Sequence, residues 1–241
     1  MNLKSKRILV FGGDLVLMNK LIPGLNHAGA HVTWVNSGEI LEDNFENGQY
    51  FKFDQIKSVA FYVNILEPFL RNSENFDGIL FALSEGTLRP IGMTNINVSR
   101  QMLEVNYLTF VELIRLVLKT KKLNKGSSIL ALSSISSIRG LKSKMAYAAS
   151  KASLNSAVLN MAAELMPKGI RVNAILKGAL TTDMEQKHVQ DMFAIGQDDS
   201  NKSNLGLTSS EELTTLCILI LSDALKTMTG TLLKLDGGYS L

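Results

Sequence analysis

The sequence contains a single cysteine, Cys217, among its 241 residues. One thiol cannot form an intramolecular disulfide, so a disulfide-stabilised secreted scaffold is excluded and a reducing, cytoplasmic environment is expected. Long apolar runs are also missing, because the longest, Leu216 to Leu221, is far shorter than the ~20 residues that a membrane-spanning helix needs. The first residues pass from charged side chains straight into a strand-like run, so we expect no signal peptide and no membrane partner.

Neither sign of charge dominates, since 25 Lys and Arg residues stand against 22 Asp and Glu, for a formal net charge of +3. Nucleic-acid binding needs a basic stripe with interleaved aromatic residues, and the scattered lysines form none. The histidines His27, His31 and His188 lack metal-ligand spacing with a cysteine or with clustered carboxylates. A G-x-S-x-G elbow is absent as well. We therefore expect no nucleic-acid partner, no metal site and no hydrolase-type catalytic triad.

The chain does contain short β-branched runs that alternate with longer helical patterns. Most of these runs are almost continuously apolar, which is typical of parallel strands buried on both faces. The pattern predicts a single α/β domain over residues 1–241, with a doubly wound, Rossmann-like parallel sheet of about seven strands and helices on both faces. Expected strands are 7–11, 31–35, 50–53, 78–83, 128–132, 170–175 and 231–235, and the clearest helices are 100–121, 146–165 and 210–221.

Tyr147 and Lys151 form a candidate acid–base pair near the start of an alanine- and serine-rich helical segment. Their spacing of four residues places both side chains on one helix face. A phenol titrates near ~10, and a neighbouring ammonium lowers that pKa by stabilising the phenolate, which makes the tyrosine usable as an acid or base. The alternative is a chance Tyr-x-x-x-Lys in a lysine-rich chain that has five tyrosines.

Two polar residues strengthen the catalytic interpretation. Ser134 lies 13 residues before Tyr147, just after the apolar run 129–132 and therefore at the carboxyl end of a predicted strand. Asn106 lies 28 residues before Ser134 among apolar helix neighbours, where its amide needs a partner or can hold a water molecule. Taken singly, the serine is an ordinary turn residue and the asparagine an ordinary helix residue. The four residues at these intervals together indicate a catalytic site.

With these residues the chain resembles the short-chain dehydrogenase/reductase family, particularly its 3-oxoacyl-carrier-protein reductase-like branch. The resemblance spans essentially the whole chain and includes GAHV, EVN, SILALSS, YAASK, RVNAIL, KGALTTDM and LDGG. It implies that Tyr147 exchanges a proton with the substrate oxygen while a hydride passes to or from a nicotinamide. It also implies that Lys151 lowers the pKa of the tyrosine and binds the nicotinamide ribose. By the same resemblance, Ser134 hydrogen-bonds the substrate oxygen, and Asn106 positions a water that links Lys151 to solvent.

The resemblance further implies residues that bind NAD(P). Asp54 matches the aspartate that bonds the adenine, and Thr182 matches the threonine that contacts the nicotinamide carboxamide. Asn36 follows the second predicted strand, where NAD-dependent members commonly place an acid. Without that acid a 2′-phosphate is not repelled, so NADP(H) is favoured over NAD(H), although no arginine attracts the phosphate either. The expected cofactor-binding residues are Gly12, Asn36, Asp54, Tyr147, Lys151 and Thr182.

The departures from the family pattern concern the cofactor. The first turn of the family reads Thr-Gly-x-x-x-Gly-x-Gly, which lets the backbone approach the dinucleotide and the pyrophosphate meet a helix N-terminus. At those four positions this chain has Phe11, Gly12, Val16 and Met18. The Asn-Asn-Ala-Gly segment is replaced by FALS at residues 81–84, and the usual Pro-Gly is Lys177-Gly178.

Two interpretations of these departures remain open. In one, the dinucleotide is bound along an altered path, and Lys177 faces the pyrophosphate. In the other, bulky side chains fill the adenosine end of the site (Phe11, Val16, Met18 and Phe81). The chain is then a catalytically weak or cofactor-free family member that acts as an oligomeric binding or regulatory protein. Because the catalytic residues are intact, we expect an NAD(P)-dependent oxidoreductase that interconverts a carbonyl and a secondary alcohol.

The substrate is expected to be a small carbonyl or alcohol compound, with a polar segment around 183–207 as a substrate loop or lid. Arg139, Lys142 and Lys144 precede Tyr147. They form either an ordinary solvated loop or a docking site for a carrier-linked or nucleotide-linked anionic substrate. The resemblance implies a homo-oligomer, a dimer or tetramer, that assembles through the helices expected at 100–121 and 146–165.

Overall fold

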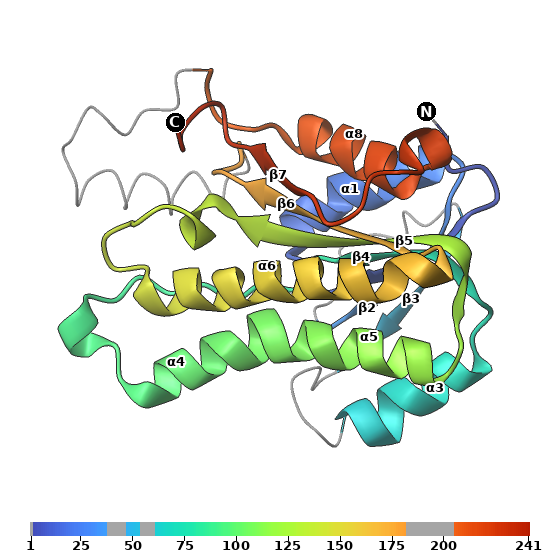
Figure 1. Ribbon diagram of the computed structural model, residues 1–241, viewed down its shortest axis with the longest axis horizontal. Helices are drawn as coiled ribbons and strands as arrows, with labels where there is room; N and C mark the ends of the chain where they lie inside the picture. Colours follow the sequence, from blue (N-terminus) through green and yellow to red (C-terminus); the bar gives the residue numbers. More distant parts are fainter. Residues whose placement is uncertain (1, 38–46, 54–60, 182–204) are drawn as a thin grey trace.

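A seven-stranded parallel sheet forms the centre of the protein (Figure 1). The computed structural model describes residues 2–37, 47–53, 61–181 and 205–241. Within them the sheet order is β3-β2-β1-β4-β5-β6-β7, and every pairing is parallel, which confirms the predicted doubly wound sheet. The strands are β1 (Arg7–Phe11), β2 (His31–Asn36), β3 (Gly48–Lys52), β4 (Phe76–Phe81), β5 (Leu123–Ser134), β6 (Arg171–Lys177) and β7 (Leu232–Leu235).

The central strands are apolar on both faces because each face is covered by helices. In β1, Leu9 and Phe11 enter one core cluster, whereas Ile8 and Val10 enter the other. All four side chains are fully buried. Burying an aliphatic or aromatic side chain of this size contributes roughly 1.5–3 kcal/mol each, so the apolar strand pattern is a main source of stability.

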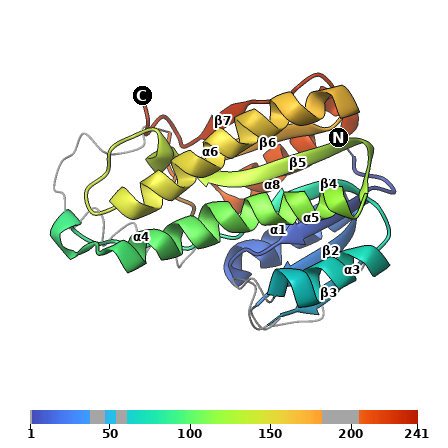
Figure 2. The same ribbon diagram turned by 60° about the horizontal axis from the view of Figure 1, so that its bottom comes forward.

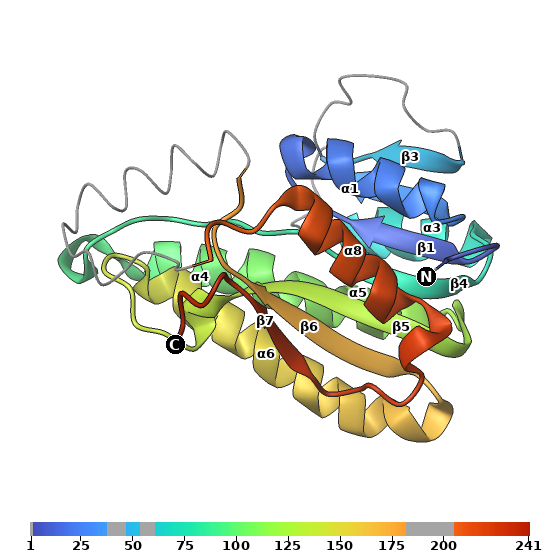
Figure 3. The same cartoon turned by 90° about the horizontal axis from the view of Figure 1, so that it is seen from above.

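Two helix layers enclose the sheet. Helices α1 (Leu15–His27) and α8 (Ser210–Leu221) pack side by side on one face (Figure 3). The other face is covered by α3 (Glu67–Asn72), α5 (Thr109–Lys119) and α6 (Met145–Leu165), and α4 (Ile96–Leu103) packs against α6. Figure 2 shows α4 and α5 as one continuous rod beside α6. The expected helix at 100–121 is therefore longer at its start, and the π-helical turn η3 (Glu104–Leu108) joins its two halves.

The chain order reverses between β1 and β4, which are neighbours in the sheet. Ligand sites in doubly wound sheets lie at the carboxyl ends of the strands beside such a reversal. β5 is longer than its expected span of 128–132, and it ends at Ser134, which pairs with Lys177 of β6. The predicted serine therefore lies at this carboxyl-terminal edge of the sheet.

Candidate active site

Helix α6 supplies the central pair of the site. Its sequence MAYAASKASLNSAVLNMAAEL is rich in alanine and leucine, which are strong helix formers. Tyr147 and Lys151 are one helical turn apart, and the Lys151 ammonium lies 5.8 Å from the centroid of the Tyr147 ring. Tyr147 is partly exposed, whereas Lys151 is completely buried. The structure therefore brings together the two residues that the spacing predicted.

The buried ammonium of Lys151 is anchored to the sheet. Its Nζ donates a hydrogen bond of 3.0 Å to the carbonyl oxygen of Leu132 in β5. Burial, together with repulsion from Lys177, lowers the pKa of Lys151 to about 7. A lysine ammonium has three N–H donors, and this is its one hydrogen bond to the described residues. The remaining donors are suited to hydroxyl groups of a ligand.

A second cation and a glycine lie close to Tyr147. The Lys144 ammonium is 5.6 Å from the centroid of the tyrosine ring, so the ammonium groups of residues about one turn before and one turn after Tyr147 both lie near its ring. Gly86 lies near another part of the ring, where a Cβ atom on the glycine would be 3.9 Å from two ring carbons. The absence of a side chain at Gly86 leaves room beside the phenol.

Asn106 links the segment after β4 to α6. It lies in the π-helical turn η3 and is completely buried; such turns are frequent at functional sites. Its Oδ1 accepts from the Glu85 backbone N–H, and its Nδ2 donates to the Glu85 carbonyl oxygen, both at 2.8 Å. Nδ2 also donates to Ser150 Oγ at 2.9 Å, and that hydroxyl donates to the Tyr147 carbonyl oxygen at 2.7 Å. Asn106 thus supports the tyrosine through Ser150, while the water expected at Asn106 stays a prediction.

Ser134 lies at the end of β5, two residues after the carbonyl that holds Lys151. Its Oγ accepts a hydrogen bond from the Ser136 backbone N–H at 3.2 Å and donates to Ser136 Oγ at 3.2 Å. These bonds cap the short 3-10 helix η4 (Ile135–Ser137). The serine, the lysine and the tyrosine are therefore connected through β5 and α6.

The turn after β1 needs its two glycines. Gly12 and Gly13 have φ values of +75° and +105°, a region that other residues rarely adopt. A Cβ atom on Gly12 would lie 2.5 Å from the Cβ of Leu83. Trp34 Nε1 donates to the Gly12 carbonyl oxygen at 2.9 Å, and Asn36 Nδ2 donates to that of Gly13 at 3.1 Å. Asn36 is buried, and its amide supports the turn itself.

Two side chains in the same turn differ from what a dinucleotide prefers. The Asp14 carboxylate caps α1, because its Oδ1 accepts from the Leu17 backbone N–H at 2.9 Å. A carboxylate at a helix N-terminus occupies the place where a phosphate group is otherwise stabilised. Met18 is fully buried, and its side chain lies 2.7 Å from the position that a Cβ atom on Gly13 would take. The sequence pattern pointed to Met18, but the carboxylate at Asp14 was not singled out.

Phe11 and Phe81, which were considered as groups that fill the adenosine end, are fully buried in the core beneath the α5 layer. Their rings stack with centroids 6.2 Å apart, and Phe81 also contacts the ring of Phe110 in α5. Both side chains therefore contribute to the packing of β1 and β4 against that helix.

Several predicted residues lie outside the described residues. These are Asp54, Thr182 and the expected lid around 183–207 apart from its last three residues. Within the described ranges there is no cluster of three or more potential metal-ligating His, Cys, Asp or Glu residues. No helix in the same ranges is long and apolar enough to cross a bilayer. Sequence reasoning missed Ser150, although it lies directly before Lys151 in the YAASK motif.

The described residues fit NAD(P) best at its nicotinamide end. The buried Lys151 ammonium keeps donors that suit ribose hydroxyls, and Gly86 leaves space beside Tyr147. At the pyrophosphate end the two glycines with positive φ are retained. The Asp14 carboxylate adds negative charge there, which weakens but does not block the approach of a phosphate.

Comparison with known proteins identifies relatives of this chain. Residues 68–240 match the family model described as Enoyl-(Acyl carrier protein) reductase. This match begins beyond the glycine turn. Dehydrogenase/reductase SDR family member 6 of Rattus norvegicus is 30% identical over 149 residues, which cover 58% of this chain and 59% of the relative. L-rhamnose 1-dehydrogenase (NAD(P)(+)) of Azotobacter vinelandii is 32% identical over 120 residues, 50% of this chain and 47% of the relative. The matches thus span about half to three-fifths of these relatives.

The fold is shared over nearly the whole chain. A short chain dehydrogenase family protein from Francisella tularensis superposes with a TM-score of 0.84 at 24% identity, covering 98% of this chain and 99% of that one. A FabI-NADH complex from Alistipes finegoldii gives a TM-score of 0.83 at 21% identity, covering 99% and 89%. Because the family model covers well over half of the sequence and the sheet has the same architecture, the chain belongs to the short-chain dehydrogenase/reductase family, a family of oxidoreductases.

Proposed function

We propose that this protein is an NAD(P)-dependent oxidoreductase that interconverts a carbonyl and a secondary alcohol, with Tyr147 as general acid and base. The observation that carries the proposal is the fully buried Lys151 ammonium, which is held by Leu132 beside the Tyr147 ring and makes no other hydrogen bond to the described residues. Burying a cation is costly, so a lysine retained there without a carboxylate partner in the described residues points to a catalytic or binding role.

Each polar residue of the site has a separate task in this mechanism. NAD(P), when bound, supplies or accepts the hydride. In carbonyl reduction the Tyr147 hydroxyl donates its proton to the substrate oxygen, and in alcohol oxidation the phenolate takes that proton back. The Lys151 ammonium stabilises the phenolate and donates hydrogen bonds to the nicotinamide ribose. Ser134 orients the substrate oxygen by a hydrogen bond from its Oγ.

The test measures dinucleotide oxidation with a panel of ketones, beginning with ethyl acetoacetate and cyclohexanone, for the wild type and for Y147F and K151M. Both variants are expected to lose at least a hundredfold in kcat, since general acid–base catalysis contributes about 10²–10⁴-fold. Y107F is the matched control, because Tyr107 is a partly exposed tyrosine on another helix. Undiminished turnover in Y147F would contradict the proposed role of the tyrosine.

NADP(H) is proposed as the preferred dinucleotide over NAD(H). Asn36 lies at the end of β2, and its Nδ2 donates a hydrogen bond to the Gly13 carbonyl oxygen. It carries no negative charge that would repel a 2′-phosphate. Comparing the Kd values of NADPH and NADH tests this preference. We expect the N36D variant to shift the preference towards NADH, because the new carboxylate repels a 2′-phosphate and accepts hydrogen bonds from ribose hydroxyls. The carboxylate cannot donate to the Gly13 carbonyl, so the Tm of N36D is expected to fall and both Kd values are measured below it.

A carrier-linked or nucleotide-linked anion is the proposed substrate class within this reaction. The Lys144 ammonium lies 5.6 Å from the centroid of the Tyr147 ring, so one cation of the preceding loop is next to the proposed reaction centre. Arg139 lies over the Tyr239 ring at 4.4 Å, and Lys142 is exposed. The positive charge of Lys144 beside the tyrosine favours an anionic group on the substrate.

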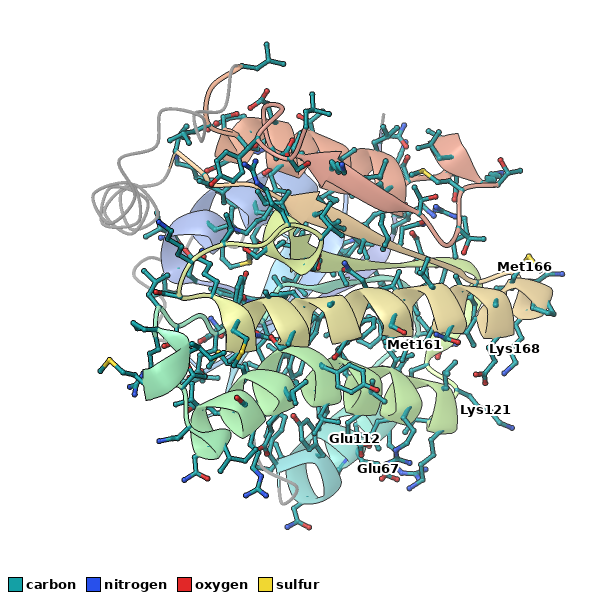
Figure 4. All side chains as sticks on the ribbon, turned by 60° about the vertical axis from the view of Figure 1, so that its left-hand side comes forward. Glu67, Glu112, Lys121, Met161, Met166 and Lys168 are labelled. Atoms are coloured by element: carbon teal, nitrogen blue, oxygen red, sulfur yellow. The ribbon has the colours of Figure 1, made fainter. Side chains whose placement is uncertain are left out.

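Assembly into a homodimer or homotetramer is proposed through α4, α5 and α6. Figure 4 shows the outer surface of α5 and α6, where Glu112 lies on α5 and Met161 lies on α6, with Met166 just after it in the 3-10 helix η5 (Met166–Lys168). The exposed positions of α6 are mainly small or uncharged and include Ala149, Ala152, Ser156, Leu159 and Ala163. Such a surface allows close helix approach in an interface. Sedimentation of the wild type and of an A152E variant tests the proposal, since a carboxylate in a close helix contact should cause dissociation.

The second candidate function is that of a cofactor-free binding or regulatory protein. It is favoured by Asp14, which places a carboxylate at the N-terminus of α1, and by Met18, which packs against Gly13. Titration of NADPH and NADH by cofactor fluorescence and by thermal shift separates the candidates. Saturable binding supports the oxidoreductase, whereas no binding at millimolar dinucleotide supports the second candidate.

A further inference from the structure

The inward face of α6 carries a polar residue beyond the proposed catalytic pair. Asn155 lies one helical turn after Lys151, and Lys151 lies one turn after Tyr147, so the three side chains share a face. Asn155 is buried, with 6% of its surface exposed. Its neighbour Leu154 belongs to the apolar core that α6 forms with the sheet.

A chain of hydrogen bonds runs from Asn155 to the end of β5. Asn155 Nδ2 donates to Ser137 Oγ at 2.7 Å. Ser137 Oγ in turn donates to the carbonyl oxygen of Ser134 at 2.5 Å. Ser137 is the last residue of η4, the short helix whose backbone also holds the Ser134 hydroxyl through Ser136. The backbone carbonyl of Ser134 is thus connected to α6 through the side chains of Ser137 and Asn155.

We propose that Asn155 is a positioning residue that holds Ser134 in register with Tyr147. This inference rests on the proposed function, in which Ser134 and Tyr147 act on the same substrate oxygen. Lys151 fixes α6 to β5 through the Leu132 carbonyl, and Asn155 fixes the following η4 turn to the same helix. Because the serine and the tyrosine both depend on α6, their spacing is kept when the helix moves relative to the sheet.

The hydrogen bonding of Asn155 argues against a purely stabilising role. Its Oδ1 is buried without a hydrogen-bond partner in the described structure. A buried acceptor left unpaired costs stability, whereas leucine, which has a similar size, would bury no polar atom. A side chain selected only for packing would therefore be apolar here. The presence of an amide here is explained by the hydrogen bond that Asn155 Nδ2 donates to Ser137 Oγ.

Two variants break the chain of hydrogen bonds at different points. N155L removes the donor and keeps the volume, and S137A removes the hydroxyl that passes the bond to Ser134. N160A is the matched control, because Asn160 is an exposed asparagine on the same helix whose side chain, within the described part of the chain, bonds only to Ser156 one turn earlier. All variants are assayed as the full chain with NADPH and ethyl acetoacetate, or with the ketone that the wild type reduces fastest.

The kinetic result expected is a loss in kcat of about tenfold in N155L and in S137A, because small displacements of reacting groups are costly. The double variant should lose no more than either single variant, since both act through one chain of bonds. The Kd of NADPH and the pH profile of kcat should match those of the wild type, and the unfolding midpoint of N155L should not fall, because leucine leaves no buried acceptor unpaired. Losses that multiply in the double variant, or a kcat that stays unchanged in both single variants, would overturn the proposal.

Hydrogen exchange gives a readout that does not depend on activity. Amides of residues 133–138 should exchange several-fold faster in N155L and S137A, whereas the peptide that contains Tyr147 should be unchanged. Unaltered exchange at 133–138 in both variants would refute the positioning link. If exchange increases as expected but the wild type reduces no carbonyl compound with either dinucleotide, the link stands and the proposed function fails.

Discussion

The carboxylate of Asp14 accepts a hydrogen bond from the backbone N–H of Leu17 and so caps α1 from within the chain. The same N-terminus follows a glycine turn at the carboxyl end of β1, where a parallel sheet of this order places a dinucleotide pyrophosphate. The Asp14 carboxylate therefore competes with a dinucleotide phosphate for the positive N-terminal end of α1.

Replacing Asp14 by asparagine should strengthen dinucleotide binding. Asparagine caps helices as well as aspartate does, so the turn is kept while the negative charge is removed. Because Asp14 is exposed and screened, the gain should be modest, roughly threefold to tenfold in Kd at low ionic strength. Calorimetric titration of D14N with NADPH at low and high salt measures this gain.

The charge effect at Asp14 can be separated from a general effect of charge. Adenosine carries no phosphate, so its Kd should be the same for D14N and the wild type. ADP carries phosphates, so its Kd should be lower for D14N, as the Kd of NADPH is. D223N removes a carboxylate that lies beside Lys6, near the start of β1 and far from the turn after it. If NADPH bound D223N as tightly as D14N, or if adenosine bound D14N more tightly than the wild type, a local effect of Asp14 would be ruled out.

Replacing Val16 and Met18 by glycine should open the same turn at a cost in stability. Met18 is fully buried, and shortening a buried methionine costs about 2–5 kcal/mol, to which each glycine in a helix adds roughly 1 kcal/mol. Dinucleotide titration should therefore be carried out well below the lowered Tm. Tighter binding of NADPH in V16G/M18G is the expected result, and weaker binding by a folded variant would show that the side chains do not obstruct the ligand.

The buried Lys151 should make the stability of the protein depend on pH. Its pKa is about 7 in the folded protein, against 10.5 for an ordinary lysine. Between these values the unfolded chain binds more protons, so the free energy of unfolding should rise as the pH increases from 7 to about 10.5. Each unit of pKa difference corresponds to about 1.4 kcal/mol. Urea denaturation of the wild type and of K151M across this range measures the effect.

The K151M variant should lose this part of the pH dependence because its side chain does not titrate. K177Q should move the rise to higher pH, since Lys177 repels the Lys151 ammonium and helps to keep its pKa low. If the free energy of unfolding changed with pH in the same way for the wild type and K151M, Lys151 would not be a buried neutral amine at high pH.

Reversing charge in the loop before Tyr147 tests the proposed substrate class. K142E and K144E should each raise KM for an acyl-carrier-linked or nucleotide-linked substrate several-fold, and the increase should shrink at high salt. Lys144 lies near the tyrosine ring, so K144E is also expected to alter kcat, whereas the exposed Lys142 should affect KM alone. A small uncharged ketone is the control substrate. An unchanged KM for the anionic substrate in both variants would leave the loop as an ordinary solvated surface.

The sheet was predictable because buried parallel strands leave a local trace in the sequence. β1 and α8 have the bounds that apolar runs and helix periodicity predicted, and the other strands differ mainly at their ends. The paired spacing of Tyr147 and Lys151 was readable for the same reason, since four residues make about one helical turn. The π-helical turn at Asn106 was not readable, because it depends on bonds to Glu85 and Ser150 from distant parts of the chain.

The sequence by itself determined the alternation of strands and helices, the family resemblance and the identity of four candidate catalytic residues, since each follows from local pattern and spacing. Only the tertiary structure decided that Lys151 is fully buried on Leu132, that Asn36 supports the glycine turn, and that Asn155 reaches Ser134 through Ser137. Burial, pKa and hydrogen-bond partners depend on residues that are distant in the chain and adjacent only after folding.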